Sequence, residues 1–268
     1  MNIGHIVGIC ISFLKTVSYL RTVLAGLFFL SIATALTKVL FSWLRTSRFK
    51  KKINTAKLPQ FIKKLSLKYN LEGKIIIFHN PKPVAFCLGI GDPRVYLSTK
   101  LLALMNKKEI EAIILHEKYH LINRDTFLAV TVNFLRGLFV LFPIVTDIME
   151  SLIRQKETNA DQYSLNYFKN PKIVLSAFKK LISCGSTTSP SLAYLVSFFP
   201  ADTLEHRIKI LKREKTFVLS FNVKHLLVSF FTFITLLSFL LLTTWPSYAK
   251  QNEAPSVCLK GHNCHLEC

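Results

Sequence analysis

The stretch "LHEKYHLINRD", residues 115–125, places two histidines, a glutamate and an Arg-Asp pair on and just after one apolar helical segment. His116 and His120 are four residues apart, so on an α-helix both imidazoles face one side and can bind one metal ion. Glu117 can reach a water on that metal and transfer its proton. The pattern His-Glu-x-x-His therefore predicts metal-assisted peptide hydrolysis. The alternative is a surface helix with two unlinked histidines.

The residues before this helix predict a compact α+β domain. "GKIIIFHN" (73–80) is β-branched and bounded by Gly and Asn, which predicts a strand. "PVAFCLGIGDPRVYLST" (83–99) predicts two strands joined by a Gly-Asp-Pro turn. Asn106 with Glu109 three residues later is a capping box that starts the histidine helix. The apolar stripe of this helix consists of Ile110, Ile113 and Ile114.

A third metal ligand is expected, because catalytic zinc usually has three protein ligands and one open position. "RQKETNADQYSL" (154–165) offers Glu157 as this ligand. Asp161, four residues later, could accept the second ring N–H of a ligating histidine and fix its tautomer. A solvated acidic patch is the alternative, although acids are scarce in this chain. Ligand type indicates one zinc ion, and other divalent ions fit the same donors.

Composition and charge indicate a membrane protein. Half of the 268 residues are hydrophobic, 22 of them are Phe, and the formal net charge is +20. Such a charge suits nucleic acid or the anionic face of a membrane. The long apolar runs favour the lipid bilayer, and the absence of an aromatic-basic motif argues against nucleic acid.

Two stretches are long and apolar enough to cross the bilayer. Residues 22–44 contain only Lys38 as a charge, near the end, where it can snorkel. The residues before them are apolar but contain Lys15 and Arg21, so 1–44 is expected to form one or two spans. Residues 221–246 are expected to form a C-terminal transmembrane helix that ends near Trp245.

A third apolar stretch predicts a helical hairpin rather than a single crossing. Within 127–147, Arg136-Gly137 interrupts the middle and Pro143 lies near the end. Two short pieces joined by a break can enter and return on the same side. This return is required because Glu157 and His116 must share one side of the membrane.

The basic runs give the orientation. Residues 45–68 contain nine Lys or Arg and no acid, and residues 206–215 are also basic. By the positive-inside rule both lie in the cytoplasm, so 45–220 forms a domain at the cytoplasmic face.

With these motifs in place, the chain resembles the integral-membrane zinc metallopeptidases. That clan includes the HtpX/CAAX-protease-like enzymes and the BlaR/MecR-type sensor peptidases. The resemblance covers about residues 75–212, through "LHEKYHLINRD", "RQKETNADQYSL" and "LEHRIKIL". It implies a mostly helical zincin-type domain with a small sheet, flanked by transmembrane helices.

The resemblance also implies roles for single residues. His116, His120 and Glu157 match the metal ligands, Glu117 the catalytic base and Asp161 the aspartate behind the ligands. An edge strand along the cleft would pair with an extended peptide substrate; it consists of Val84, Ala85, Phe86, Cys87 and Leu88. Arg124-Asp125 is expected to tie the helix to its surroundings in a structural role.

The chain departs from these relatives near its C-terminus. Where they often carry His-Pro, it has Phe199-Pro200. His206 could stabilise the oxyanion, with an ordinary surface histidine as the alternative. The tail, 247–268, contains the last three cysteines, with a metal site or a disulfide both open; these are Cys258, Cys264 and Cys268.

The sequence thus predicts a membrane-bound zinc metalloendopeptidase of a bacterial inner (plasma) membrane, with its active site facing the cytoplasm. Its expected partners are a protein or peptide substrate and the lipid bilayer. The rival hypothesis is a non-catalytic membrane sensor or scaffold that retains the peptidase fold.

Overall fold

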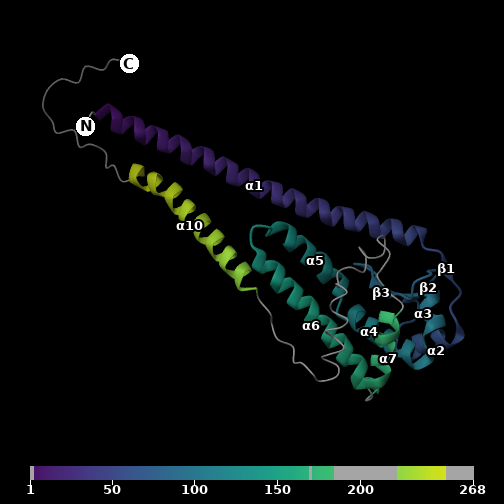
Figure 1. Ribbon diagram of the computed structural model, residues 1–268. Helices are drawn as coiled ribbons and strands as arrows, with labels where there is room; N and C mark the ends of the chain where they lie inside the picture. The colour runs from purple at the N-terminus through teal and green to yellow at the C-terminus, as the bar shows by residue number, and fades with distance from the viewer. Residues whose placement is uncertain (1–2, 169–170, 184–221, 252–268) are drawn as a thin grey trace.

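The computed structural model describes residues 3–168, 171–183 and 222–251. A long helix, α1 (Ile3–Lys52), runs along one side of the molecule, and a small sheet with several helices packs at its C-terminal end (Figure 1). The expectation of a mostly helical α+β chain with a small sheet is confirmed.

Helix α1 is a single helix of 50 residues. It contains both apolar stretches of the N-terminal segment, so no turn separates an upstream span from residues 22–44. Lys15 and Arg21 are good helix formers and do not interrupt it. Within the described part of the chain, Thr22–Lys52 is the one helix long and apolar enough to cross a membrane, and its apolar window is only 6% buried.

The second expected span falls on α10 (Val223–Gln251). The part of α10 whose side chains are described, Val223–Ser238, is an apolar helix, and the role of α10 as a transmembrane helix stays a prediction. The three tail cysteines lie outside the described residues.

The sheet contains four strands in the order β1, β2, β4, β3. β2 (Ile75–Phe78) is parallel to β4 (Arg94–Ser98), and β3 (Ala85–Leu88) is antiparallel to β4. The strands expected in 73–80 and 83–99 are therefore present, with β3 at the edge. The two-residue β1 (Thr55–Ala56) was not expected and pairs with β2.

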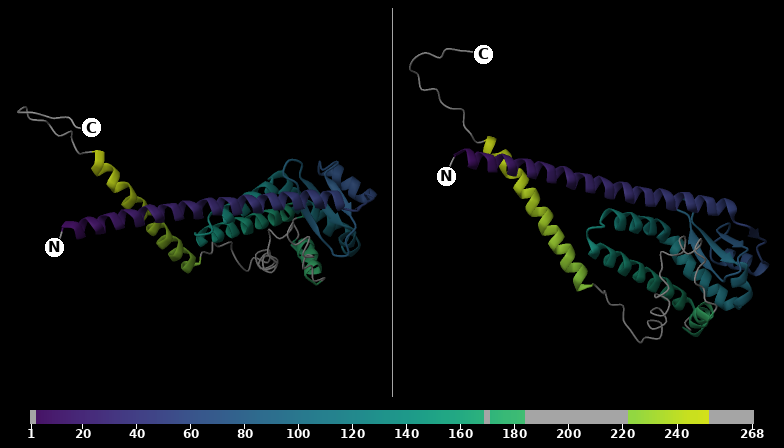
Figure 2. Two further views of the ribbon diagram at one scale, coloured as in Figure 1. Left: turned by 90° about the horizontal axis from the view of Figure 1, so that it is seen from above. Right: turned by 45° about the horizontal axis from the view of Figure 1, so that its top comes forward.

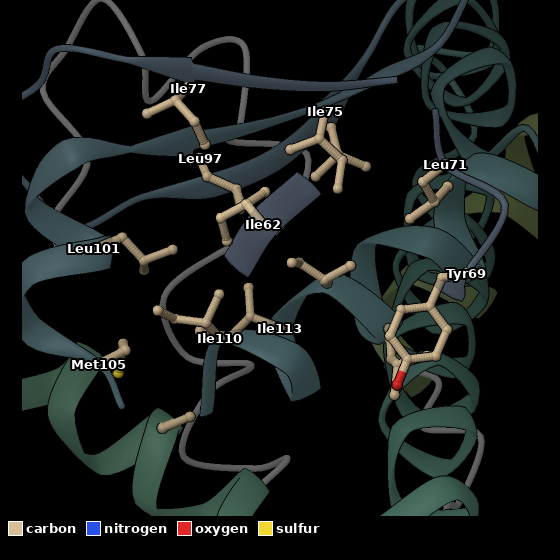
Figure 3. Packing of buried hydrophobic residues seen from close by; sticks show 14 residues of the cluster. Ile62, Tyr69, Leu71, Ile75, Ile77, Leu97, Leu101, Met105, Ile110 and Ile113 are labelled. Atoms are coloured by element: carbon tan, nitrogen blue, oxygen red, sulfur yellow. The ribbon is translucent and has the colours of Figure 1, made fainter. Parts of the chain in front are cut away.

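Alternation along the strands gives the sheet two apolar faces. One face packs against the helices α2 (Gln60–Lys68), α3 (Thr99–Leu104) and α4 (Lys107–Ile122), as Figure 3 shows. Its buried side chains include Ile62, Ile75, Ile77, Val95, Leu97, Leu101, Ile110, Ile113 and Ile114.

The other face packs against the end of α1. Phe86 stacks on Tyr96 with ring centroids 5.3 Å apart, and Phe49 of α1 lies 5.9 Å from Phe86. Ile53, just after α1, packs against the same cluster. The apolar helix and the sheet are therefore joined directly rather than through a loose linker.

The histidine helix α4 begins with the expected capping box. The Glu109 N–H donates to the Asn106 side chain (2.9 Å), and the Asn106 N–H donates to the Glu109 carboxylate (2.8 Å). On its far side α4 packs against α7 (Pro171–Ser183), where Ala112 contacts the buried Val174 and Phe178. Helix α4 is thus held between the sheet and α7.

A helical hairpin follows α4, formed by α5 (Asp125–Leu138) and α6 (Pro143–Phe168). Its turn points along α1 toward the N-terminal part of that helix and away from the sheet (Figure 2). The expected break at Arg136-Gly137 is wrong: both residues lie within α5, and the turn falls at residues 139–142. Gly137 stays helical because it lies against Ala35 of α1, where a Cβ would meet the Ala35 Cα at 3.0 Å.

Candidate metal centre

The two histidines of α4 point their outer ring nitrogens at each other. The Nε2 atoms of His116 and His120 are 3.1 Å apart. This follows from their spacing, because residues four apart on a helix lie one above the other. His120 is buried, and His116 is partly exposed.

Glu157 of α6 approaches both histidines. Its Oε1 is 3.3 Å from His120 Nε2, and its Oε2 is 3.5 Å from His116 Nε2. Glu157 is 2% exposed as a residue, so its carboxylate is buried within the fold. Helix α6 is held against α4 nearby by Ser164, whose hydroxyl donates to the Ala112 carbonyl (3.1 Å).

These three side chains fit a tetrahedral metal ion. One ligand atom from each lies within 4.8 Å of the others, which is the one such cluster among the described residues. Zinc binds imidazole nitrogen and carboxylate oxygen at about 2.0–2.2 Å, which in a tetrahedron separates the ligand atoms by about 3.3–3.6 Å. The separations in the structure, 3.1, 3.3 and 3.5 Å, lie within or close to that range.

Each histidine has a second carboxylate behind its ring. His116 Nδ1 lies 3.0 Å from Asp161 Oδ1, and His120 Nδ1 lies 2.9 Å from Asp125 Oδ2. A carboxylate at Nδ1 holds the proton there, so the Nε2 lone pair faces the centre of the cluster. Both aspartates are buried.

Asp125 contacts a candidate metal ligand, His120, which its expected structural role did not include. The chain turns sharply after α4 because Arg124 adopts a left-handed conformation (φ 52°). The turn brings Asp125, the first residue of α5, back beside His120, and Lys156 of α6 pairs with the other carboxylate oxygen at 3.0 Å. The signal in the sequence was a carboxylate five residues after the second histidine.

The surrounding carboxylates favour positive charge at the centre. Burial lowers the pKa of His120, but its hydrogen bonds to the Asp125 and Glu157 carboxylates outweigh burial and raise this pKa to about 10. Glu117 adds to the effect by its charge. In a chain of net charge +20, this cluster of carboxylates is a negative site suited to a cation.

The catalytic candidate Glu117 lies in α4 between the two histidines and is buried. The edge strand β3 runs close to it, since α4 contacts β3. The pKa of the Cys87 thiol is raised by burial and also by the charges of Glu117 and Asp125. The structure thus brings the expected edge strand beside the glutamate.

The predicted residues Val84, Ala85, Phe86, Cys87 and Leu88 divide between the two faces of the sheet. Val84, Phe86 and Leu88 are buried in the cluster against α1, whereas Ala85 packs on the α4 side. His206 lies outside the described residues, so its expected role stays a prediction.

Comparison with known proteins agrees with this geometry. Protease HtpX homologues resemble parts of the chain: one from Caldanaerobacter subterraneus subsp. tengcongensis is 37% identical over 71 residues, covering 25% of this chain and 23% of the relative. One from Pelodictyon phaeoclathratiforme is 27% identical over 115 residues (41% and 40%), and one from Limosilactobacillus fermentum is 25% identical over 179 residues (50% and 60%). The chain thus spans less than two thirds of the length of these relatives.

The match to a family is more extensive. The sequence model of the family described as BlaR1 peptidase M56 covers residues 12–211, about three quarters of the chain. This range includes α4 with its two histidines and α6 with Glu157 and Asp161. The chain belongs to the BlaR1 peptidase M56 family.

Proposed function

We propose that this protein is a membrane-anchored zinc metalloendopeptidase that hydrolyses peptide bonds of membrane or membrane-proximal proteins. The observation that carries the proposal is the convergence of His116, His120 and Glu157 at tetrahedral spacing. Membership in a peptidase family supports it.

In this proposal the three converging side chains would hold one zinc ion through two imidazole nitrogens and a carboxylate. When bound, zinc would polarise the scissile carbonyl and lower the pKa of an attacking water. Asp161 and Asp125 keep the proton of each imidazole on Nδ1, so both Nε2 atoms remain available as ligands.

Glu117 is proposed as the general base. Its carboxylate accepts a proton from the attacking water and then donates it to the amine nitrogen of the departing peptide segment. Its position next to His116 suits this role, because adjacent residues on a helix differ by about 100° and do not compete for one ligand position.

The free edge of β3 is proposed to hold the substrate. β4 occupies one side of β3, and the described sheet has no strand on the other side. An extended peptide can pair with that edge through main-chain hydrogen bonds, which places a peptide bond near α4 without demanding a particular side chain.

We further propose that the site faces the cytoplasm of a bacterial inner membrane. The apolar part of α1 is followed by nine Lys or Arg within residues 45–68, which favours the cytoplasm for the metal-site domain 45–220. On this arrangement α10 crosses the membrane a second time.

The test compares the purified wild-type protein with Glu117→Gln and Glu157→Gln in detergent. Zinc content and cleavage of casein are measured with and without a chelator. Glu117→Gln is expected to retain zinc and lose roughly 10²- to 10⁴-fold in rate, because it removes the base but no ligand. Glu157→Gln is expected to lose zinc as well.

Glu111→Gln is the matched control, since Glu111 lies on the same helix but bonds to Lys68 and Tyr69 instead. It is expected to keep both zinc and activity. Wild-type protein that binds zinc but cleaves neither casein nor itself would contradict the proposal and support the non-catalytic sensor or scaffold. Activity that survives Glu117→Gln would contradict the assigned base.

A further inference from the structure

The turn of the α5–α6 hairpin exposes apolar side chains. Phe139, Val140 and Leu141 are 41%, 63% and 52% exposed, and no charged residue occurs from 137 to 146. Turns between helices of water-soluble domains are normally polar. This turn therefore has the surface of an apolar insertion rather than of a solvated loop.

The contact with α1 fixes the level of the turn. α5 runs antiparallel to α1 (Figures 1 and 2), and Gly137 lies against Ala35. With about 1.5 Å of rise per residue in both helices, the turn at 139–142 lies beside about residues 30–33 of α1. That level is inside the uncharged apolar stretch 22–37.

Charged groups from three helices fall at about one level below the turn. By the same count, Asp147 of α6 is about one helical turn from the tip, at about the level of Lys38 in α1. Asp147 also meets the start of α10, where His225 Nδ1 is 2.8 Å from its carboxylate and the Asn222 N–H donates to it at 3.0 Å.

Arg136 is the charged residue of α5 nearest to the turn. Its guanidinium extends to Glu150, 3.6 Å away and farther from the tip than Asp147. This direction is that of an arginine that snorkels toward water. The charged layer thus has an aqueous side toward the metal site and an apolar side toward the tip.

Three backbone N–H groups at the ends of the turn are paired within the protein, which lowers the cost of placing them in lipid. The Phe139 N–H donates to the Leu135 carbonyl (2.9 Å), and the Phe142 N–H to the Phe139 carbonyl (2.9 Å). At the start of α6, Pro143 has no N–H. The next donor, Ile144 N–H, bonds to the buried hydroxyl of Ser229 in α10 (3.1 Å).

We propose that the α5–α6 turn inserts into the acyl chains of the membrane leaflet on the metal-site side and returns without crossing. The level of Lys38, Asp147 and His225 marks where it enters. The partner of this surface is the hydrocarbon of the bilayer, and the inference does not depend on the proposed peptidase activity.

The experiment uses tryptophan fluorescence of the full chain in lipid nanodiscs. Trp43 and Trp245 are replaced by Phe, and Val140→Trp or Leu141→Trp is added. Leu67→Trp serves as the matched control, because Leu67 is equally exposed (51%) but lies on α2 beside the sheet.

An inserted Val140→Trp is expected to lose roughly half of its emission when bromine-labelled acyl chains replace ordinary ones, since residues within the ~30 Å hydrocarbon core touch those chains. The emission of Val140→Trp should be insensitive to aqueous iodide. The emission of Leu67→Trp should be quenched by iodide and not by the brominated lipid. Iodide quenching of both tip variants, without lipid quenching, would overturn the proposal. Shielding of both from lipid and iodide would also overturn it, because it would show that protein rather than hydrocarbon covers the turn.

Discussion

The two ring nitrogens of each site histidine have different surroundings. Nε2 of both rings faces the centre that Glu157 shares, and Nδ1 faces a buried aspartate. The rings therefore have little freedom to rotate or to change tautomer, and the ligand atoms are held at nearly the spacing that a bound cation requires.

Asp125→Asn tests this arrangement at His120. An amide can present its NH₂ group to Nδ1 and favour the wrong tautomer, so the affinity for zinc is expected to fall roughly 10- to 100-fold. The dissociation constant is measured by competition with a chromogenic chelator. Lys156→Met is the control, because it removes the other partner of Asp125 and leaves the imidazole bond in place. Equal affinity in Asp125→Asn and the wild type would contradict the role of Asp125.

The histidine positions could be predicted because their geometry is local. Spacing of four along a helix is enough to place His116 above His120. The hydrogen bond from His120 to Asp125 could not be predicted, because it depends on the left-handed backbone of Arg124. A residue other than glycine rarely adopts the left-handed conformation, and the neighbouring sequence does not indicate that Arg124 does so.

At the level of elements, Glu109 makes two sets of hydrogen bonds that hold the start of α4. Glu109 completes the capping box, and its carboxylate also accepts bonds from Ser176 (2.6 Å) and Lys180 (2.7 Å) of α7. Burial raises the pKa of Glu109, but the bonds from Lys180, Ser176 and Asn106 outweigh burial and lower it.

Glu109→Gln should therefore destabilise the protein in a pH-dependent way. Because the folded pKa lies below the unfolded value of about 4.3, the charge stabilises the fold above that pH and the effect disappears as pH falls through the folded pKa. The expected loss near pH 7 is about 1–3 kcal/mol. Denaturant midpoints at neutral and acidic pH measure it.

Glu72→Gln, at an exposed position between α2 and β2, is the control and should change neither midpoint. A deficit of Glu109→Gln that grows toward acidic pH would show that the carboxylate is not stabilised by its partners.

Secondary-structure elements that have a local sequence pattern could be predicted. Elements that form only through contacts with distant residues could not. The strands β2, β3 and β4 follow from β-branched runs and a turn. β1 has only two residues, and it exists because Thr55 and Ala56 pair with β2. The hairpin was expected, but its turn was placed too early because Gly137 was taken as a break. Its small size instead allows contact with α1.

At the scale of the whole molecule, the contact between α1 and α5 joins the apolar helix to the metal-site domain. Gly137→Leu should force the two helices apart, because even a Cβ at this position would meet Ala35 at 3.0 Å. The expected loss of stability is roughly 1–3 kcal/mol. It is measured as a lower melting temperature in nanodiscs.

Gly26→Leu is the control for this prediction. Gly26 lies in the same apolar helix α1, and a Cβ there meets nothing within 4 Å. Its melting temperature should not fall below that of the wild type, because leucine is a better helix former than glycine. An equal effect of both substitutions would mean that the helix contact contributes nothing.

The overall class of the molecule could be predicted from composition and periodicity, but its arrangement could not. The length of α1 and its packing beside α5 depend on contacts between residues about one hundred positions apart. Hydropathy identifies which segments are apolar and carries no information on which of them touch.

The length of helix α5 therefore fixes the distance between the candidate metal centre and the contact with α1. Asp125, which holds His120, stands at one end, and Gly137, which touches Ala35, stands at the other. Counted from the level of Lys38, where the proposed insertion begins, the candidate metal centre lies about 14 Å from the edge of the lipid. A polypeptide that leaves the bilayer fully stretched covers that depth in about four residues. On the proposed function, cleavage is therefore expected close to a membrane anchor, and one turn added to α5 should shift the cleavage point outward along the substrate.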